Sequence, residues 1–162
     1  MRKGFSSYLV AERSGEPAAA LGFNRCGDEA LFLERYLDRP IELAATEALG
    51  RPVERGQIVE IGNFASTGAF AMIDLWTDAA NDLGGGREVA VSTLTAPLRA
   101  MFARIGVPIV AIGDANAARL GDAQADWGTY YALDPKVCVA AIAVGQAALR
   151  KFAARRQRRL CA

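Results

Sequence analysis

Residues 58–63 constrain the fold more than any other part of the chain, because they place a carboxylate in the middle of a buried strand. Aliphatic residues flank Glu60 on both sides, and the poor strand formers Gly62 and Asn63 follow at once. We therefore expect an interrupted strand. Its carboxylate either faces a cavity where a perturbed acid can be used, or is paired with an arginine or lies on an exposed strand face.

The composition restricts the chemistry that the chain can perform. Its 162 residues, of which 52% are hydrophobic, suffice for one domain with a core. The chain has no histidine, which excludes Ser-His-Asp and Cys-His catalysis and histidine-ligated metal sites. Three widely spaced cysteines, Cys26, Cys138 and Cys161, indicate neither a disulfide framework nor a zinc site, so no metal is expected. Proton transfer must use carboxylates, tyrosines, lysines or water.

No run of about 18 apolar residues is present that could form a membrane-spanning helix, and the first residues do not form a signal peptide. We therefore expect a cytoplasmic protein without a transmembrane segment.

The charge is distributed unevenly along the chain. Residues 1–135 carry a formal net charge of −6, whereas residues 136–162 carry +7. This asymmetry predicts a main domain at residues 1–145 and a basic, helical C-terminal tail at residues 146–162. The tail either meets an anionic partner, such as an acidic carrier protein or a phospholipid surface, or is a solvated terminal helix. A nucleic-acid partner is the less favoured choice.

Hydrophobic periodicity and turn residues predict an alternation of strands and helices. We expect strands at residues 7–12, 18–24, 58–61, 88–93, 107–112 and 136–144, and helices at residues 40–49, 66–83, 96–105 and 146–160. Residues 31–33 are expected to prolong the sheet and residues 114–126 to form a loop. The glycine run at 84–86 follows a helix and precedes a strand, which indicates a flexible connection rather than a phosphate loop. The strand, helix, strand order at 88–112 predicts a crossover between parallel strands.

Three segments resemble the signature segments of the thermostable hemolysin family: residues 31–42 (LFLERYLDRPIE), 58–66 (IVEIGNFAS) and 127–131 (WGTYY). Residues 92–106 fit the same family. The thermostable hemolysin family is similar to a branch of the GCN5-related N-acyltransferases, near the acyl-homoserine lactone synthases. The resemblance implies an α/β (α+β) fold with a mixed, splayed central sheet flanked by helices. It also implies a shortened N-terminus, because only residues 1–6 precede the first hairpin.

The resemblance further implies an acyltransferase that moves a fatty acyl group from a thioester to a small amine. Acyl-coenzyme A and acyl-carrier protein both remain open as donor co-substrates, and no permanently bound cofactor is expected. Glu60 would act as general base, directly or through water, and Tyr130 or Tyr131 as the acid for the departing thiolate. The substrate-binding candidates are Phe32, Asn63, Phe64, Ser66, Thr67, Gly68, Thr93 and Trp127.

Within this set, Ser66, Thr67 and Gly68 would present backbone N–H groups to phosphate at a helix N-terminus. Asn63 stands where the lactone synthases have arginine, so their S-adenosylmethionine substrate and lactone product are not carried over. The alternatives are a membrane-active, hemolysin-like protein, and a catalytically inactive module that binds an acyl carrier or nucleic acid.

Overall fold

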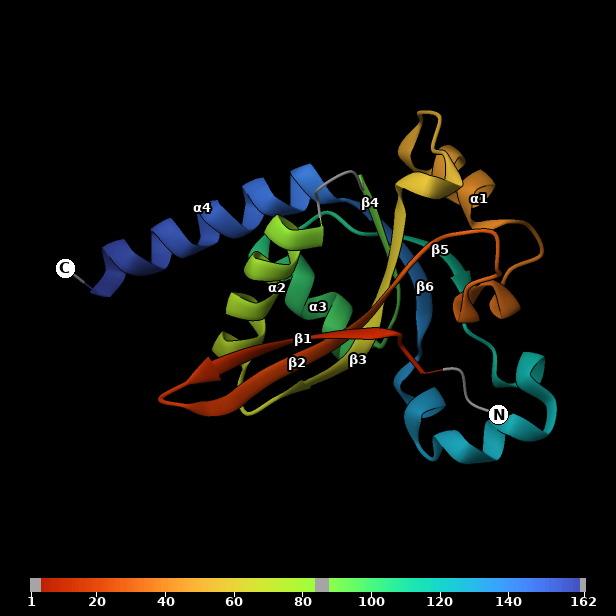
Figure 1. Cartoon of the computed structure of the whole chain (residues 1–162), viewed down its shortest axis with the longest axis horizontal. Coiled ribbons are helices and arrows are strands. Elements are labelled where there is room, and N and C mark those ends of the chain that lie inside the picture. Colours follow the sequence, from red (N-terminus) through yellow and green to blue (C-terminus); the bar gives the residue numbers. More distant parts are fainter. Residues whose placement is uncertain (1–3, 84–87, 161–162) are drawn as a thin grey trace.

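The computed structural model describes residues 4–83 and 88–160 (Figure 1). Its centre is a six-stranded mixed sheet with the strand order β1-β2-β3-β4-β6-β5. The strands are β1 (Ser7–Arg13), β2 (Glu16–Arg25), β3 (Ile58–Ser66), β4 (Val89–Leu94), β5 (Val110–Asp114) and β6 (Lys136–Ala141). The α-helices are α1 (Ile41–Leu49), α2 (Ala69–Leu83), α3 (Ala96–Ile105) and α4 (Ile142–Leu160). Short 3-10 helices are η1 (Phe32–Tyr36), η2 (Arg55–Gln57), η3 (Ala117–Trp127) and η4 (Tyr130–Leu133). The expected mixed α/β class is confirmed.

The sheet opens in its middle, between β3 and β4. These strands pair in parallel over only three residue pairs, which end at Glu60 and Val91. Beyond that point β3 continues to Ser66 beside β2, while β4 continues to Leu94 beside β6. The expected splay of the central sheet therefore begins immediately after Glu60.

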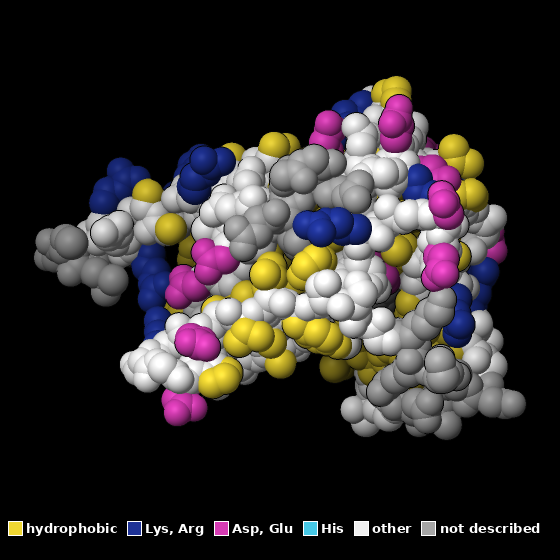
Figure 2. All heavy atoms as spheres, viewed as in Figure 1, with side chains coloured by type: hydrophobic (Ala, Val, Ile, Leu, Met, Phe, Trp, Pro, Cys, Tyr) yellow, Lys and Arg dark blue, Asp and Glu magenta, His cyan; other side chains and the backbone are white. Residues whose placement is uncertain are grey.

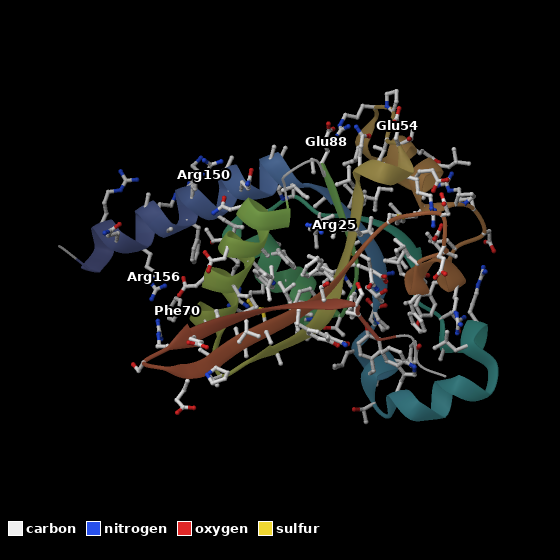
Figure 3. The ribbon with its side chains drawn as sticks, in the orientation of Figure 1. Arg25, Glu54, Phe70, Glu88, Arg150 and Arg156 are labelled. Carbon is white, nitrogen blue, oxygen red and sulfur yellow. The ribbon has the colours of Figure 1, made fainter. Side chains whose placement is uncertain are left out.

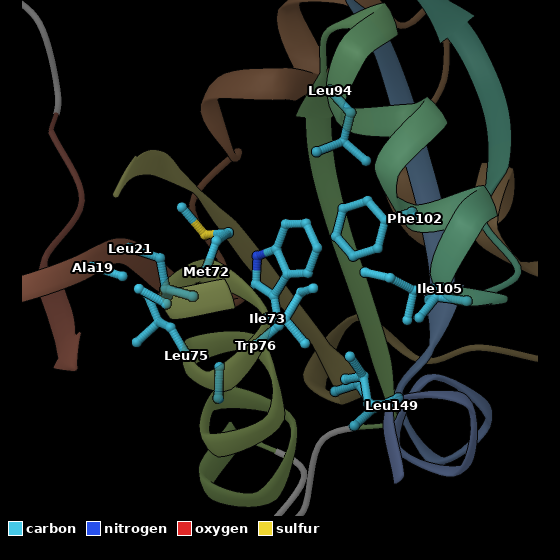
Figure 4. Packing of buried hydrophobic residues seen from close by; sticks show 14 of the residues in the cluster. Ala19, Leu21, Met72, Ile73, Leu75, Trp76, Leu94, Phe102, Ile105 and Leu149 are labelled. Carbon is cyan, nitrogen blue, oxygen red and sulfur yellow. The ribbon is translucent and has the colours of Figure 1, made fainter. Parts of the chain in front are cut away.

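Two hydrophobic cores cover the two faces of the sheet. The larger one lies against α2, α3 and α4, where Trp76 of α2 stacks on Phe102 of α3 with ring centroids 3.9 Å apart (Figure 4). The second lies against α1 and η1 and contains Leu33, Ile41 and Ile58. Alternate residues of β3 and β4 point to opposite cores, as strand geometry requires.

Several expected elements differ in the structure. Residues 31–33 do not extend the sheet, because the Glu34 side chain accepts the Leu31 N–H at 2.7 Å and closes the turn of η1. Most of the predicted loop at 114–126 belongs to the 3-10 helix η3 (Ala117–Trp127), which is interrupted at Gly121 with φ 56°. The last strand ends at Ala141, and α4 begins there rather than at residue 146. The glycine run at 84–86 lies outside the described residues.

The strands before and after α3 are parallel, as predicted, but they are not neighbours in the sheet. Both β4 and β5 pair antiparallel with β6, so they run the same way with β6 between them. The last strand of the chain thus enters the sheet between two strands that precede it, a pairing that local sequence patterns do not indicate.

Candidate functional site

Glu60 is the buried acid at the point where the sheet divides. It is the last residue of β3 that pairs with β4, and it faces Asn24 across the β2 ladder. Its side chain is 4% exposed. Oε1 accepts the Leu33 N–H of η1 at 3.4 Å, whereas Oε2 has no hydrogen-bond partner among the described residues.

This environment raises the pKa of Glu60. Burial is the main cause, and the negative charge of Glu34 acts in the same direction, while Asn24 and the η1 backbone oppose the shift. A carboxyl group with a raised pKa and one unengaged oxygen is suited to accept a proton from a bound molecule.

A β-bulge follows Glu60 and turns the strand toward the opening. Gly22 pairs with Gly62 and Ala20 with Ala65, so β3 contains one more residue than β2 in this interval. Asn63 adopts φ 50°, a left-handed conformation that asparagine tolerates better than most residues, and its amide donates to the Tyr8 hydroxyl at 3.3 Å. The poor strand formers in the sequence therefore mark the bulge.

A pocket of about 370 Å³ opens in front of Glu60. Seven of the expected site residues line it: Phe32, Glu60, Asn63, Phe64, Thr93, Trp127 and Tyr130. The structure adds residues that sequence reasoning missed: Gly4, Phe5, Asn24, Tyr36, Ile61, Gly62 and Leu98. Among these, the alternation of β2 could have indicated Asn24, but the N-terminal segment carries no such signal.

Aromatic side chains form one wall of this pocket. The Trp127 ring stacks on Phe32 at 5.7 Å and lies 5.2 Å from the Tyr130 ring, measured between centroids. The Tyr130 hydroxyl donates to the Thr93 carbonyl of β4 at 3.3 Å. Burial raises the pKa of Tyr130 to about 12, so the phenol keeps its proton near neutral pH.

The remaining expected residues lie elsewhere. Tyr131 is not among the described lining residues, and its hydroxyl lies 2.7 Å from that of Tyr36. The turn of Ser66, Thr67 and Gly68 stands at the far end of β3. Two of its backbone N–H groups are already bound, Thr67 to the Ala18 carbonyl and Gly68 to the Ser66 hydroxyl, each at 2.9 Å.

Arg55 forms a cluster of hydrogen bonds that holds η1 in place. Arg55 donates to Glu34 at 2.8 and 2.9 Å and to Glu42 at 2.8 Å. It also donates to the carbonyls of Gly27 and Glu29 at 2.6 and 2.9 Å. These bonds hold the segment that presents the Leu33 N–H to Glu60. Sequence reasoning did not identify Arg55, although a charged residue just before a buried strand is a usable signal.

A smaller cavity of about 90 Å³ lies on the opposite face of the sheet, between β3, β4, β6 and the helices α2, α3 and α4. Its lining is almost entirely apolar, and Ile61 lines both this cavity and the Glu60 pocket. The two spaces thus approach each other where β3 and β4 separate.

Comparisons with known proteins bear on the family and the fold. The sequence model described as thermostable hemolysin matches residues 3–146. No curated protein sequence matches the chain.

Solved structures of acyl-homoserine lactone synthases share the fold. MesI, described as coenzyme A-dependent, superposes with a TM-score of 0.60 at 10% identity, covering 93% of this chain and 71% of its own. BjaI with SAM and isopentyl-CoA superposes with a TM-score of 0.57 at 10% identity, and the match covers 90% of this chain and 64% of BjaI. TofI with an inhibitor and MTA superposes with a TM-score of 0.55 at 17% identity, and the match covers 88% of this chain and 68% of TofI.

Proposed function

The chain belongs to the thermostable hemolysin family, and from this membership and the site geometry we propose that it is an acyltransferase that moves a fatty acyl group from a thioester to a small amine. The observation that carries the proposal is the Glu60 carboxylate. It is buried, has one unengaged oxygen, and lies in a pocket where β3 and β4 separate. Such a gap can hold a thioester beside an acid-base group.

The reaction needs one base and one acid. An amine bound in the Glu60 pocket loses a proton to the carboxylate, directly or through water, and its nitrogen forms a bond to the thioester carbonyl carbon. The carbon–sulfur bond then breaks, and the sulfur leaves with the phenolic proton of Tyr130. The products are an amide and a free thiol, and both side chains return to their starting states by proton exchange with solvent.

The aromatic wall and the bulge would position the two substrates. Phe32, Phe64 and Trp127 offer apolar contact area to the acceptor, and the Asn63 amide offers a polar contact at the rim. The Thr93 carbonyl holds the Tyr130 hydroxyl toward the gap. Tyr131 supports Tyr36 through their hydroxyl contact, which makes it a candidate positioning residue.

The donor thioester would approach from the N-terminal end of α2. The N–H groups of Thr67 and Gly68 in the preceding turn are already bonded, so an anion would meet the first-turn N–H groups of α2 itself. Arg156 of α4 lies over the Phe70 ring in the first turn of α2, with its guanidinium carbon 3.8 Å from the ring centroid (Figure 3). A phosphate of coenzyme A or of a carrier protein would meet both groups, so both remain candidate donors.

Mass spectrometry of the purified protein with acyl thioesters and a panel of amines tests the proposal. We expect an amide product whose formation rate falls by about 100-fold or more in the Glu60→Gln variant. The rate should also fall as the pH drops below the raised pKa of Glu60, because the protonated carboxyl cannot accept a proton. Amide formation at the wild-type rate by Glu60→Gln would contradict the assignment of the base.

The family description raises a second candidate, direct membrane damage. Its structural support is α4, where Arg150, Lys151, Arg155, Arg156 and Arg158 form no ion pair with a carboxylate in the part of the chain that the structure describes. None of the described helices is long and apolar enough to cross a membrane. Dye release from anionic liposomes by the protein alone, lost when residues 146–162 are deleted, would favour this candidate. Release that needs added thioester and amine would favour the acyltransferase.

A further inference from the structure

The Glu60 pocket is built largely from aromatic rings. Six of its lining residues are aromatic: Phe5, Phe32, Tyr36, Phe64, Trp127 and Tyr130. They come from the N-terminal segment, η1, β3, η3 and η4, so the rings meet only in the folded chain. The face of an aromatic ring carries partial negative charge, and proteins use several such rings around one space to bind positively charged amines.

The charge that faces a ligand in this pocket is negative. Glu60 supplies the only carboxylate among the described lining residues, and no lysine or arginine lines the pocket with it. The Glu60 side chain is 4% exposed, and its Oε2 has no hydrogen-bond partner in the part of the chain that the structure describes. A buried carboxylate without a counter-charge is costly, so a cation in the pocket would stabilise its ionised form. An acceptor with a carboxylate of its own would instead meet a like charge.

A charged groove borders the pocket and does not favour an anion. Phe32 lines both spaces. The charged residues that line the groove are two basic and three acidic ones: Arg25, Arg35, Asp28, Glu29 and Glu34. Because Glu34 is paired with Arg55, the remaining charges of the groove balance. The Arg35 guanidinium carbon lies 5.1 Å from the Phe32 ring centroid, so a ring of this wall already attracts a cation of the chain itself.

We propose that the acceptor is a small diamine: one amine reacts beside Glu60, while the second stays a charged ammonium group held by the aromatic rings. This inference rests on the proposed function and names its acceptor class. The bond changes are those of amide formation given above, and the second ammonium group neither gains nor loses a proton. Its positive charge partly offsets the buried carboxylate, which a neutral acceptor of the same size cannot do.

Three acceptors of similar length test the class: 1,4-diaminobutane, 1-aminopentane and 4-aminobutanoate. The end far from the reacting amine is positive, neutral or negative, respectively. Each is supplied with the same acyl-pantetheine thioester, which contains the arm common to coenzyme A and carrier proteins, and the amide is measured by mass spectrometry. We expect kcat/KM for the diamine to exceed that for 1-aminopentane by about tenfold, the factor that a desolvated cation–π contact supplies. The value for 4-aminobutanoate should be the lowest.

Unreactive probes separate recognition from catalysis. Tetramethylammonium and tert-butanol have nearly the same shape but differ in charge. Their dissociation constants are measured by NMR titration without thioester, so that no turnover occurs. We expect tetramethylammonium to bind at least about tenfold more tightly than tert-butanol. Glu60→Gln should reduce this preference while leaving the affinity for tert-butanol unchanged, because only the cation gains from the carboxylate.

Variants assign the preference to the rings. Trp127→Leu should lower the affinity for tetramethylammonium about fivefold and that for tert-butanol by less than about twofold. Leu98→Ala is the matched control, because Leu98 lines the pocket without a ring, and it should keep the preference. Incorporation of 5,7-difluorotryptophan repeats the test without loss of packing, since fluorine weakens the negative ring face with little change in size. The only other tryptophan, Trp76, lies in the core on the opposite face of the sheet.

Three outcomes would overturn the inference: equal affinity for the two probes, a preference that neither Trp127→Leu nor fluorination reduces, or a kcat/KM for 1-aminopentane or 4-aminobutanoate that matches or exceeds that for the diamine. These outcomes are separable from failure of the proposed function. Amide formation without preference for the diamine would retain the transferase and reject the inference. Selective binding of tetramethylammonium that depends on Trp127 and Glu60, without an amide from any donor and amine, would retain the cation site and reject the transferase.

Discussion

At the scale of single residues, Glu60 makes the proposed chemistry possible and lowers stability at neutral pH. Its folded-state pKa lies above the unfolded value, so the folded protein keeps a proton at pH values where the unfolded chain has lost it. Stability therefore falls as the pH rises from the unfolded pKa through the folded one, and is greatest below both. The carboxylate that could accept a proton is thus kept at a cost to the fold.

Glu60→Gln should therefore stabilise the protein at pH 7, by an amount on the order of 1 kcal/mol for each unit of pKa shift. The amide keeps an oxygen for the Leu33 N–H, and it carries no charge to bury. The difference in free energy of unfolding between variant and wild type should disappear at about pH 4 and below, where the carboxyl group is protonated in both states. Urea titrations at several pH values measure this. If the stability of the variant relative to wild type were lower at pH 7 than at pH 4, the raised pKa of Glu60 would be contradicted.

Tyr130→Phe tests the proposed acid. Because the pKa of the phenol is about 12, it is protonated at all working pH values, and its loss should slow transfer by about 100-fold. A donor whose thiol is much more acidic than pantetheine, such as a thiophenyl ester, leaves without a proton. The defect should therefore shrink to within a few-fold with that donor. An undiminished defect would assign Tyr130 a packing role instead, through its contact with Trp127.

At the scale of elements, η1 depends on a charge cluster that the sequence does not reveal as one unit. The Glu34 carboxylate accepts hydrogen bonds from the N–H groups of Leu31 and Ile41 and two from the Arg55 guanidinium. These bonds keep its pKa low despite burial, which opposes them. Arg55 therefore stabilises the turn and neutralises a charge that would otherwise raise the pKa of Glu60 further.

Arg55→Gln should cost about 3 kcal/mol in stability, because it leaves the carboxylates of Glu34 and Glu42 partly buried without their counter-charge. In the folded fraction, the acid limb of the pH–rate profile should move to higher pH. Without Arg55 the negative charge of Glu34 is no longer neutralised, and it raises the pKa of Glu60 further. A purely structural role would lower the amount of folded enzyme without moving that limb. Arg51→Gln is the control, because Arg51 pairs with the exposed Glu88 away from η1.

The N-terminal segment closes one side of the Glu60 pocket through two glycines. Gly22 and Gly62 pair across β2 and β3, and the Phe5 ring packs on both. A Cβ atom at Gly62 would lie 2.6 Å from Phe5 Cζ, which is too close for a real contact. The ring can lie there only because neither strand residue has a side chain.

Gly62→Ala should displace Phe5, lower the melting temperature through a loss of about 1–3 kcal/mol, and admit bulkier amines to the pocket. In a Phe5→Ala background the same substitution should cost much less, because the clash has been removed. The double-mutant cycle measures that coupling. Additive effects of the two substitutions would show that the contact is unimportant in solution.

At the scale of the whole molecule, α4 gives the protein its charge asymmetry. Its first turns are held by Gln146, whose amide donates to the Ala80 carbonyl at 2.7 Å, and by the buried Leu149. Its last turns extend past the body of the protein, and Lys and Arg side chains gather there (Figures 1 and 2). The division into a domain at 1–145 and a tail at 146–162 stays a prediction. In the structure, α4 is one continuous helix from Ile142.

We expect the basic face of α4 to matter for a carrier-protein donor and not for small thioesters. Replacing both Arg150 and Arg155 with glutamine should raise the KM for an acidic acyl-carrier protein about tenfold at low salt, and the effect should fade at high salt. The KM for the acyl-pantetheine donor should not change. Arg13→Gln, on the β1–β2 turn, is the matched control. An equal effect on both donors would place α4 in the acyl site rather than at a docking surface.

Local sequence patterns predicted most elements and the buried position of the Glu60 carboxylate. A carboxylate between aliphatic residues, followed by Gly62 and Asn63, indicated an interrupted strand, and the structure has a bulge there. The family resemblance of residues 31–42, 58–66 and 127–131 implied site residues in all three segments, and Phe32, Trp127 and Tyr130 do line the pocket. The interrupted strand depends on the preferences of a few neighbouring residues, which are present in the sequence itself.

The tertiary structure alone decided which distant segments meet. The insertion of β6 between β4 and β5, the packing of Phe5 on two glycines and the Arg55 cluster each join residues that lie far apart in the chain. The unpartnered atoms of Ser92 and Trp76 are likewise defined by what surrounds them in space. Burial and hydrogen-bond satisfaction are properties of the packed chain, so a residue's own identity fixes its chemistry but not the partner, charge or cavity that it faces.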